Sequence, residues 1–478
     1  MSKSFYITTT LPYVNAPLHI GHALEFIRSD SLARIKILQG NDVFFNTGTD
    51  EHGVKIFNNA NNIGLSPQEY VDNGFKVFKD QVSQFGILED INFIRTTDDN
   101  HIKAAQEFWK RVNDNGYIYK KNYKAKYCIG CEEIKTDSEL VGGECPIHPG
   151  SKIELIDEEN YFFKLSILQD SLTSFYSSHS DFVIPEFRFN EIKSFVSRGL
   201  DDFSISRLKD NMPWGIPVPG DDKHVMYVWF DALVNYISTL GWPNKDENFN
   251  KYWIDGTPTQ YCGKDNTRFQ ALIWQAMLIA AGISNSHQIV VNGFITADKG
   301  VRMSKSLGNG IDPSDIISQY GTDALRMFLL KEISSFEDSP FTLERFRDSY
   351  NANLANGLGN LTSRIMTLSE KYCDAWIGLP DPKLFNKVCE VVEKFDLQKA
   401  ITIIWEEIGL LDSEIQISQP FKVVKEDLDA GRDMISGHVG KLYTIAEALS
   451  PFMPETSKII IDLIRDNKKP ENPLFVRL

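Results

Sequence analysis

The chain has 478 residues, enough for several domains and more than one hydrophobic core. Hydrophobic residues make up 42% and charged residues 24%, a globular composition that excludes extended disorder. Its 65 acidic residues outnumber the 50 basic ones, and the net charge of −15 excludes a protein that coats nucleic acid or an anionic membrane with its whole surface.

Three features of the sequence indicate a cytoplasmic protein that does not enter a membrane. Residues 1–5 lack the apolar stretch of a secretory signal peptide. The longest apolar helix, near 271–283, is interrupted by Gln275 and is too short to span a bilayer. Six cysteines in so long a chain do not form a disulfide scaffold, so a reducing compartment fits best.

The first fifty residues predict a strand, a helix and a second strand. Residues 5–10 are rich in β-branched and aromatic side chains, and prolines end the run. From His19 to Gly40 the apolar residues follow helical spacing, and residues 43–45 form another short apolar strand. A strand, helix and strand of this length form a right-handed parallel crossover unit.

Two histidines lie where the first strand passes to its helix, in the run Leu18-His19-Ile20-Gly21-His22. The free N–H groups and the positive dipole end of a helix N-terminus suit phosphate. Gly21 lets the backbone approach a ligand closely. The alternative is that His19 and His22 only cap the helix or fill the core, and this motif alone leaves both interpretations open.

The strand–helix–strand pattern returns late, with a strand at 259–262, a helix at 269–281 and a strand at 288–295. The segment between the two patterns has a different character and is rich in Lys, Tyr and Gly near 120–150. We therefore predict an α/β fold in which one Rossmann-like domain with a parallel sheet is split by an insertion.

The insertion carries four potential metal ligands in two pairs. Cys128 and Cys131 flank an Ile-Gly pair, and Cys145 and His148 follow after thirteen residues. Two such pairs predict one structural Zn²⁺ per chain, held in a closed knuckle by three thiolates and one imidazole. A coincidence of cysteines is the alternative.

A polar loop follows the last predicted strand of the α/β domain. It contains Arg302, Ser304, Lys305 and Ser306 between two glycines. Cations and hydroxyls on such a loop suit a triphosphate, although an ordinary solvated basic loop would look similar. Each motif alone is weak, but this loop and the histidine pair, about 280 residues apart and each at a strand end, together indicate a nucleotide site.

Beyond about residue 350 the sequence predicts an α-helical bundle. Apolar residues step by three and four through 354–372, 397–408, 442–449 and 459–464. Pro420 ends the second of these segments.

These motifs resemble the HIGH and KMSKS signatures of the class I aminoacyl-tRNA synthetases, and most closely those of the methionyl-tRNA synthetase family. The stretches 10–15, 48–53, 214–217, 227–232 and 263–265 are similar too, in the family's order, so the resemblance runs from about residue 5 to about 450. It implies a Rossmann-like catalytic domain split by a zinc-knuckle insertion and followed by an α-helical anticodon-binding bundle. The implied parts are 1–116 and 211–295 for the catalytic domain, 117–210 for the insertion, 296–350 for the KMSKS-loop region and 351–478 for the bundle.

The resemblance implies a methionine–tRNA ligase, which activates L-methionine with ATP to methionyl-adenylate and transfers it to the 3′ adenosine of tRNA(Met). Mg²⁺ would accompany the ATP. His19 and His22 would bind the phosphates, and Lys305 with Arg302 would hold the pyrophosphate. The other nucleotide-binding positions implied are Gly21, Asp265, Ser304 and Ser306. The chain ends soon after the bundle, without the appended domain through which some members dimerise, so we expect a monomer.

The resemblance also implies which residues bind the other substrates. Asp50 would accept the ammonium group of methionine. The implied side-chain pocket consists of Leu11, Tyr13, Trp229, Ala232, Tyr236 and Trp274. Asn360, Arg364 and Phe421 would contact the anticodon of the tRNA. Without the resemblance, the aromatic residues would be read as ordinary core and the bundle residues as a solvated helix face.

Some positions depart from the family pattern, and two other functions compete. Arg302 stands where lysine is usual, Gln270 where a pocket histidine is common, Leu233 where some members have proline, and Phe421 where a tryptophan usually stacks on the anticodon. The alternatives are a class I synthetase of the cysteine type and a non-catalytic paralogue that binds tRNA. A paralogue would be expected to have degraded signatures, whereas His19, His22 and Lys305 are intact.

Overall fold

The structure is a computed structural model. Most contacts fall within one of two compact units of the chain. Unit 1 comprises Met1–Leu18, Gly40–Gln81 and Glu89–Val291, and unit 2 comprises His19–Gln39, Val82–Leu88 and Asn292–Leu478. The structure describes residues 3–130, 133–135, 139–146, 150, 153–244, 246–301, 303, 310–376 and 378–478.

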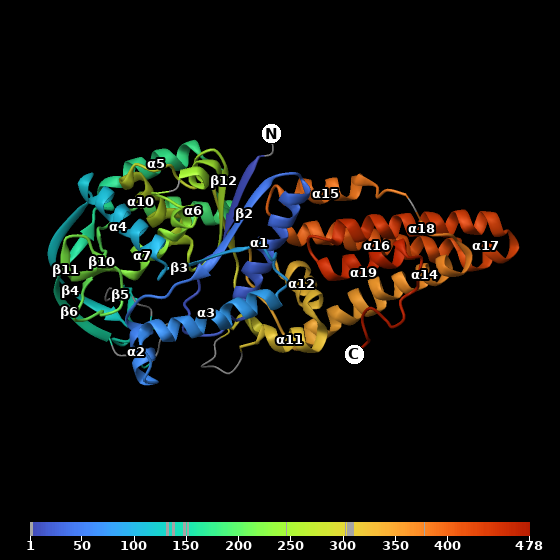
Figure 1. Ribbon diagram of the computed structural model, residues 1–478, viewed down its shortest axis with the longest axis horizontal. Coiled ribbons are helices and arrows are strands. Elements are labelled where there is room, and N and C mark those ends of the chain that lie inside the picture. Colours follow the sequence, from blue (N-terminus) through green and yellow to red (C-terminus); the bar gives the residue numbers. More distant parts are fainter. Residues whose placement is uncertain are drawn as a thin grey trace. The chain divides into compact units, whose positions relative to one another are not determined.

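Unit 1 is built around a six-stranded sheet with the order β3-β2-β1-β12-β13-β7 (Figure 1). Strand β1 pairs in parallel with β2 on one side and with β12 on the other, while β2 pairs with β3 and β13 with β7, also in parallel. The strands are β1 Ser4–Thr8, β2 Asp42–Thr49, β3 Asn92–Arg95, β7 Val183–Ile184, β12 Thr257–Gly263 and β13 Gln288–Asn292. The strand order reverses between β1 and β12, and the carboxyl ends of strands at such a switch point are where open α/β sheets bind ligands.

The two predicted crossover patterns thus meet in one parallel sheet, as expected for an α/β core. The segment 117–210 contributes two things. It supplies β7 to the edge of the parallel sheet, between α5 Gln169–Ser178 and α6 Glu186–Ser197. It also forms a four-stranded sheet with the order β5-β4-β6-β8 and antiparallel pairing. These strands are β4 Ile118–Cys128, β5 Glu133–Lys135, β6 Ile153–Phe163 and β8 Phe203–Ser204.

The core of unit 1 is aromatic. Phe108 and Trp109 of α4 (Asp99–Asp114) pack against Phe230, with ring centroids 5.9 and 5.2 Å apart. Phe108 also contacts Trp274, at 5.6 Å. The remaining helices of the unit include α2 Val54–Asn62, α3 Pro67–Gln84, α7 Val228–Leu233, α8 Asn235–Ser238, the π-helical segment η4 Phe269–Ile273 and α10 Trp274–Ala281. A third, antiparallel sheet has the order β10-β11-β9, formed by β9 Ser206–Leu208, β10 Pro217–Val218 and β11 Asp221–Met226.

In the part of unit 2 that the structure describes, the strands are the parallel pair β14 Ile295–Thr296 and β15 Ser339–Pro340. Its helices are α1 Ile20–Leu38, α11 Pro313–Tyr320, α12 Thr322–Lys331, α13 Leu343–Ser349, the π-helical segment η7 Tyr350–Gly359, α14 Asn360–Tyr372, α15 Pro382–Val392, α16 Leu397–Ser418, α17 Pro420–Glu426, α18 Leu428–Leu449 and α19 Pro454–Arg465. Helix α18 packs against α14, α15, α16, α17 and α19, which gives the helical bundle predicted beyond residue 350.

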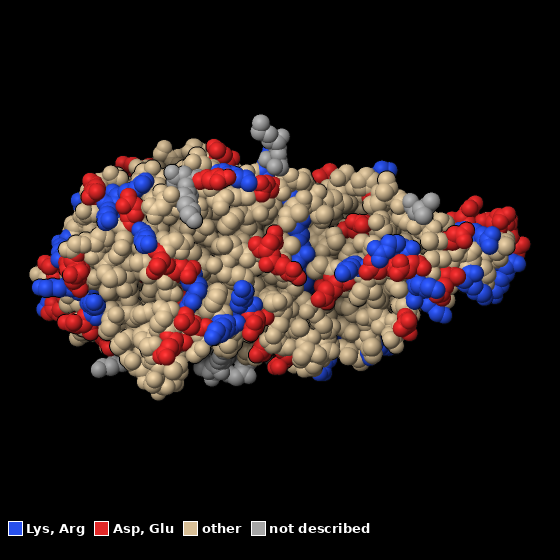
Figure 2. Space-filling model, viewed as in Figure 1, with Lys and Arg blue, Asp and Glu red and all other residues tan. Residues whose placement is uncertain are grey.

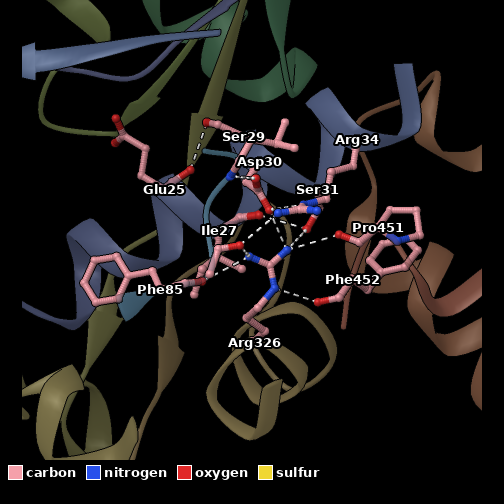
Figure 3. Close-up of polar contacts among 12 residues, drawn as sticks. Glu25, Ile27, Ser29, Asp30, Ser31, Arg34, Phe85, Arg326, Pro451 and Phe452 are labelled. Carbon is pink, nitrogen blue, oxygen red and sulfur yellow. Dashed lines mark hydrogen bonds and ion pairs between the residues drawn. The ribbon is translucent and has the colours of Figure 1, made fainter. Parts of the chain in front are cut away.

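A buried ion pair joins separate segments of unit 2 (Figure 3). The guanidinium of Arg326 on α12 donates to the Asp30 carboxylate on α1 at 2.7 Å, and both side chains have no exposed surface. Arg326 also donates to the carbonyls of Phe85, Gly86, Pro451 and Phe452. One side chain thus connects α1, the segment 82–88 and the turn between α18 and α19.

The structure differs from the predicted elements at three places. The single strand expected at 288–295 is two strands in different sheets, because the chain leaves the parallel sheet after β13 and β14 pairs instead with β15. Between them Gly293 lies against the Glu337 backbone, which a side chain at this position would approach to 2.2 Å. The helix expected at 269–281 begins with the π-helical turn η4. Helix α15 lies in the stretch beyond 350 that was predicted to be helical, but it is not one of the four apolar segments named there. No helix among the described residues is both long and apolar enough to cross a membrane.

Candidate active site

The histidine pair forms the start of α1 in unit 2. His19 is the N-cap, and its Nδ1 accepts hydrogen bonds from the backbone N–H groups of Gly21 (3.1 Å) and His22 (3.4 Å). His22 Nδ1 in turn accepts from the His19 backbone N–H at 3.2 Å, and the two rings stack with centroids 3.7 Å apart. A neutral imidazole that accepts on Nδ1 carries its hydrogen on Nε2. The pair therefore presents two N–H donors at the positive end of a helix, which suits an anion.

Gly21 lies against the ring that caps the helix. A side chain at this position would meet His19 Nδ1 and Cε1 at 3.2 and 3.1 Å, closer than most such contacts. Glycine at position 21 therefore leaves room for the His19 ring in its capping position.

Asp50 and Tyr13 come together just beyond the carboxyl ends of β1 and β2. The Asp50 N–H donates to the Pro12 carbonyl at 3.0 Å, and the Val14 N–H donates to the Asp50 carbonyl at 3.2 Å. Asp50 is buried, whereas Leu11 and Tyr13 are half-buried. The structure thus places a buried carboxylate beside the loop that bears Leu11 and Tyr13.

Asp265 belongs to the same edge of the parallel sheet. It is exposed and lies in the turn directly after β12, the strand that pairs with β1. The carboxyl ends of β1, β2 and β12 face one way because the strands are parallel. The edge of the sheet in unit 1 therefore carries both carboxylates, Asp50 and Asp265.

Four predicted pocket residues lie on neighbouring helical segments of unit 1. Trp229 on α7 stacks on Phe269 of η4, with ring centroids 3.9 Å apart and planes 8° from parallel. Tyr236 on α8 and Trp274 on α10 are buried, and their ring centroids are 6.0 Å apart. Ala232 is buried one helical turn from Tyr236. The Tyr236 hydroxyl accepts a hydrogen bond from Gln270 Nε2.

The sequence analysis missed a set of buried polar residues in unit 1, one of which, His52, follows Asp50 closely in the chain. His52 Nδ1 is 3.2 Å from the Asp231 carboxylate, and His101 Nδ1 is 2.9 Å from the Ser238 hydroxyl. Burial raises the pKa of the Asp231 carboxyl, and the nearby His52 opposes that shift. Burial also lowers the pKa of His101 to about 3, helped by His52. His101 and Asp231 are far apart in the sequence, so no local spacing marks them as neighbours.

Several predicted site residues lie outside the residues that the structure describes. They are Cys131, His148, Arg302, Ser304, Lys305 and Ser306. Of the four predicted metal ligands, Cys128 and Cys145 are described, and both are fully buried. Cys128 is the last residue of β4, and Cys145 follows a short turn closed by Val141 and Glu144. No cluster of three or more potential ligands occurs among the described residues.

Of the three bundle residues, Arg364 on α14 and Phe421 on α17 line one pocket, and Asn360 is not among its lining residues. Asn360 begins this helix and is exposed, and Arg364 pairs with Asp412 of α16 at 2.5 Å. A pocket of about 340 Å³ is lined by Arg364, Phe421 and His438, among other residues. The remaining wall is mainly apolar and includes Ile365, Leu368, Ile415 and Ile435. The structure therefore brings Arg364 and Phe421 together at one pocket.

Comparison with known proteins relates this geometry to one family. The family of tRNA synthetases class I (M) matches residues 5–153 and 147–366. A methionine–tRNA ligase of Caldanaerobacter subterraneus is 41% identical over 96% of this chain and 73% of its own length. That of Nostoc sp. is 45% identical over 96% of this chain and 89% of its own. The structure of Mycobacterium tuberculosis methionyl-tRNA synthetase in complex with methionyl-adenylate has a TM-score of 0.90 and 35% identity, and covers 96% of this chain and 94% of its own. The chain therefore belongs to the methionine type of the class I aminoacyl-tRNA synthetases.

Proposed function

We propose that this protein is a methionine–tRNA ligase. It activates L-methionine with ATP to methionyl-adenylate and transfers the methionyl group to the 3′ adenosine of tRNA(Met). The observation that carries the proposal is that identity to methionine–tRNA ligases extends over nearly the whole chain, including the Rossmann-like sheet and the bundle.

In the first step the methionine carboxylate attacks the α-phosphorus of ATP in line, and the bond to pyrophosphate breaks. Catalysis then consists of positioning and of stabilising the charge that develops on the phosphates. His19 and His22 donate their Nε2–H groups to phosphate oxygens, next to Gly21. Lys305 and Arg302 hold the leaving pyrophosphate, helped by the hydroxyls of Ser304 and Ser306. Asp265 binds the ribose, and Mg²⁺ arrives with the ATP.

Methionine binds through its ammonium group and its side chain. The Asp50 carboxylate, buried beside Tyr13, pairs with the ammonium group. Leu11, Tyr13, Trp229, Ala232, Tyr236 and Trp274 form the side-chain pocket. The stacked Trp229 and Phe269 rings support this assignment, because a thioether makes favourable contacts with aromatic rings.

The bundle reads the anticodon of tRNA(Met). Asn360 and Arg364 hydrogen-bond to splayed bases, and Phe421 stacks on one of them. The support is the pocket that Arg364 and Phe421 both line, together with the 41% exposure of Phe421.

One structural Zn²⁺ would be held by Cys128, Cys131, Cys145 and His148 and would stabilise the insertion. The donor set fits this ion, because Cys128 and Cys145 are fully buried and thiolates in closed structural sites are shielded from water. With four protein ligands such an ion would have no open position, so it would take no part in the reaction. We further propose that the protein acts as a monomer in the cytoplasm, where the remaining cysteines stay reduced.

Amino-acid-dependent exchange of pyrophosphate into ATP tests the proposal. Methionine drives this exchange in the wild-type protein, and cysteine does not. Exchange driven by cysteine would indicate the cysteine type of synthetase, and no exchange with either amino acid would indicate a non-catalytic paralogue. Lys305→Ala is expected to reduce the exchange rate about 100-fold or more. A wild-type rate in this variant would remove the role assigned to the loop.

A further inference from the structure

A second buried carboxylate, that of Glu51, directly follows Asp50 in the chain. Glu51 has no exposed surface. Its Oε1 accepts hydrogen bonds from the Thr49 hydroxyl at 2.6 Å and from Arg95 Nε at 2.8 Å, and its Oε2 accepts from the Thr97 hydroxyl. Thr49 ends β2 and Arg95 ends β3, so this carboxylate joins the carboxyl ends of two neighbouring parallel strands of unit 1.

The main chain of Glu51 is held as firmly as its side chain. Its N–H donates to the Thr96 hydroxyl at 2.9 Å, and its carbonyl accepts from Trp214 Nε1 at 2.6 Å. The Gly53 N–H donates in turn to the Trp214 carbonyl at 3.0 Å. Glu51 is therefore bonded to the end of β2, to the segment 95–97 and to Trp214.

These bonds also fix the peptide group that joins Asp50 to Glu51. The oxygen of this group accepts from the Val14 N–H at 3.2 Å, and its nitrogen is the donor to the Thr96 hydroxyl. On the other side of the residue, the Asp50 N–H donates to the Pro12 carbonyl at 3.0 Å. The direction in which the Asp50 side chain leaves the backbone is thus set by its neighbours.

We propose that Glu51 is a positioning residue for the amino group of the substrate. Its carboxylate, held by Arg95, Thr49 and Thr97, keeps Asp50 aimed at the ammonium group of methionine. A charge-assisted hydrogen bond is short and depends on its geometry, so a displaced Asp50 carboxylate would bind the ammonium group less well. The inference rests on the proposed function, because it takes Asp50 as the ammonium-binding residue.

Two ligands that differ only in the amino group isolate this contact. L-Methioninol and 4-(methylthio)butan-1-ol share the hydroxymethyl and thioether ends, and only the first has an ammonium group. Each is measured as an inhibitor of methionine-driven pyrophosphate exchange. The inhibition constant of the second divided by that of the first is here called the amino-group preference. Damage to the side-chain pocket would weaken both ligands alike, and loss of active protein changes neither constant.

Glu51→Ala is expected to lower the amino-group preference by about five- to tenfold, less than the full worth of one hydrogen bond to a charged group. Glu51→Gln is expected to restore it to within about twofold of the wild type, because the amide oxygen can accept from Arg95 and Thr49 while the amide N–H donates to the Thr97 oxygen. Thr49→Val removes a single bond to the carboxylate and should lower the preference about two- to threefold, so it carries the test if Glu51→Ala does not fold.

The matched control is Asp72→Ala, which removes the other carboxylate bound to Arg95, at 2.6 Å on α3. It is expected to keep the wild-type preference, because Asp72 has no bond to the Asp50–Glu51 peptide group or to Glu51 among those described. Asp50→Asn should abolish most of the preference, and Glu51→Ala added to it should cause less than about a twofold further fall, because both changes act on the same contact.

Three results would overturn the proposal. One is a wild-type preference in Glu51→Ala, or in Thr49→Val where that variant carries the test. Another is a fall in Asp72→Ala or in Glu51→Gln as large as that in Glu51→Ala. The third is a double variant in which the effects of Asp50→Asn and Glu51→Ala multiply. Failure of the proposed function is distinct from all three, because the wild-type protein itself would then show no methionine-driven exchange.

Discussion

At the residue scale, the histidine pair has a structural role that the hydrogen bonds show and a chemical role that we propose. His19 Nδ1 caps α1, which is the interpretation that the sequence left open beside phosphate binding. The two roles use different ring atoms, because capping occupies Nδ1 and leaves the hydrogen on Nε2. Capping and phosphate binding are therefore compatible, and they can be separated by substitution.

Two substitutions at position 19 separate these roles. His19→Asn keeps a good N-cap, so its free energy of unfolding should stay within about 0.5 kcal/mol of the wild type, whereas His19→Ala should lose about 1 kcal/mol. Both remove the imidazole and should lower kcat for pyrophosphate exchange about 100-fold or more. Denaturant unfolding and exchange assays measure the two effects. If His19→Asn exchanged at the wild-type rate, the ring would serve only as a cap.

Another residue-scale prediction concerns His101, whose pKa burial lowers to about 3. Its unfolded value is about 6.5, so between these values the unfolded chain binds more protons than the folded one. This contribution to stability is fully present above pH 6.5 and is lost as the pH falls toward 3. Between pH 6.5 and pH 5 the wild type should lose roughly 2 kcal/mol more than His101→Asn.

Urea unfolding at a series of pH values measures that difference, and His179→Asn, at an exposed histidine, is the control. The His101 variant should show a shallower fall in stability than either the wild type or the control. Parallel curves for all three proteins would contradict a neutral, buried His101.

At the element scale, the ion pair between α12 and α1 holds together segments that are distant in the chain. Removing Arg326 would leave the Asp30 carboxylate buried without its partner, along with several carbonyls. Arg326→Met should therefore reduce the free energy of unfolding of unit 2 by about 3–5 kcal/mol. Arg465→Ala, which removes an exposed ion pair, should change it by less than about 1 kcal/mol. Urea denaturation measures both variants. An equal loss of unfolding free energy in Arg326→Met and Arg465→Ala would show that the buried ion pair stabilises unit 2 no more than an exposed one.

The bundle pocket leads to a prediction about tRNA. Phe421→Ala should lower kcat/KM for tRNA charging by roughly 10–100-fold, since stacking one base on an aromatic ring is worth about 1–3 kcal/mol. Phe421→Trp should charge tRNA at least as well as the wild type. Pyrophosphate exchange needs no tRNA and should be unchanged in both variants. The control is Ile417→Ala on α16, which removes an 83% exposed apolar side chain. If Phe421→Ala lowered the rate of pyrophosphate exchange as much as it lowered tRNA charging, Phe421 could not act on the anticodon alone.

Elements with a clear period or boundary were predictable from the sequence. The parallel strands β1 and β2, the start of α1 at His19 and the helices of the bundle all follow from such local signals. The break between β13 and β14 was not predictable, because it depends on the pairing of β14 with β15 from a distant segment. The buried hydrogen bonds that link Gln260, Gln275 and Ser286 were missed for the same reason, because these polar residues look unrelated in the sequence until the fold brings them together.

At the scale of the whole molecule, the excess of acidic residues excludes a protein that coats nucleic acid, but it does not exclude the recognition of tRNA by a few residues. Residues 351–478 contain 15 basic and 19 acidic residues, so even the bundle is not basic overall. On the face shown in Figure 2, acidic and basic side chains are interspersed. Recognition of tRNA by such a surface should depend on a few placed residues, with phosphate contacts setting position and base contacts setting specificity.

The most direct test of the central claim is the charging of tRNA(Met) transcripts with labelled methionine by the wild-type protein. We predict methionine- and ATP-dependent charging of the transcript with the CAU anticodon, and a large loss of charging when that anticodon is replaced. Failure to charge this transcript with methionine, or charging of a cysteine tRNA with cysteine in its place, would contradict the account.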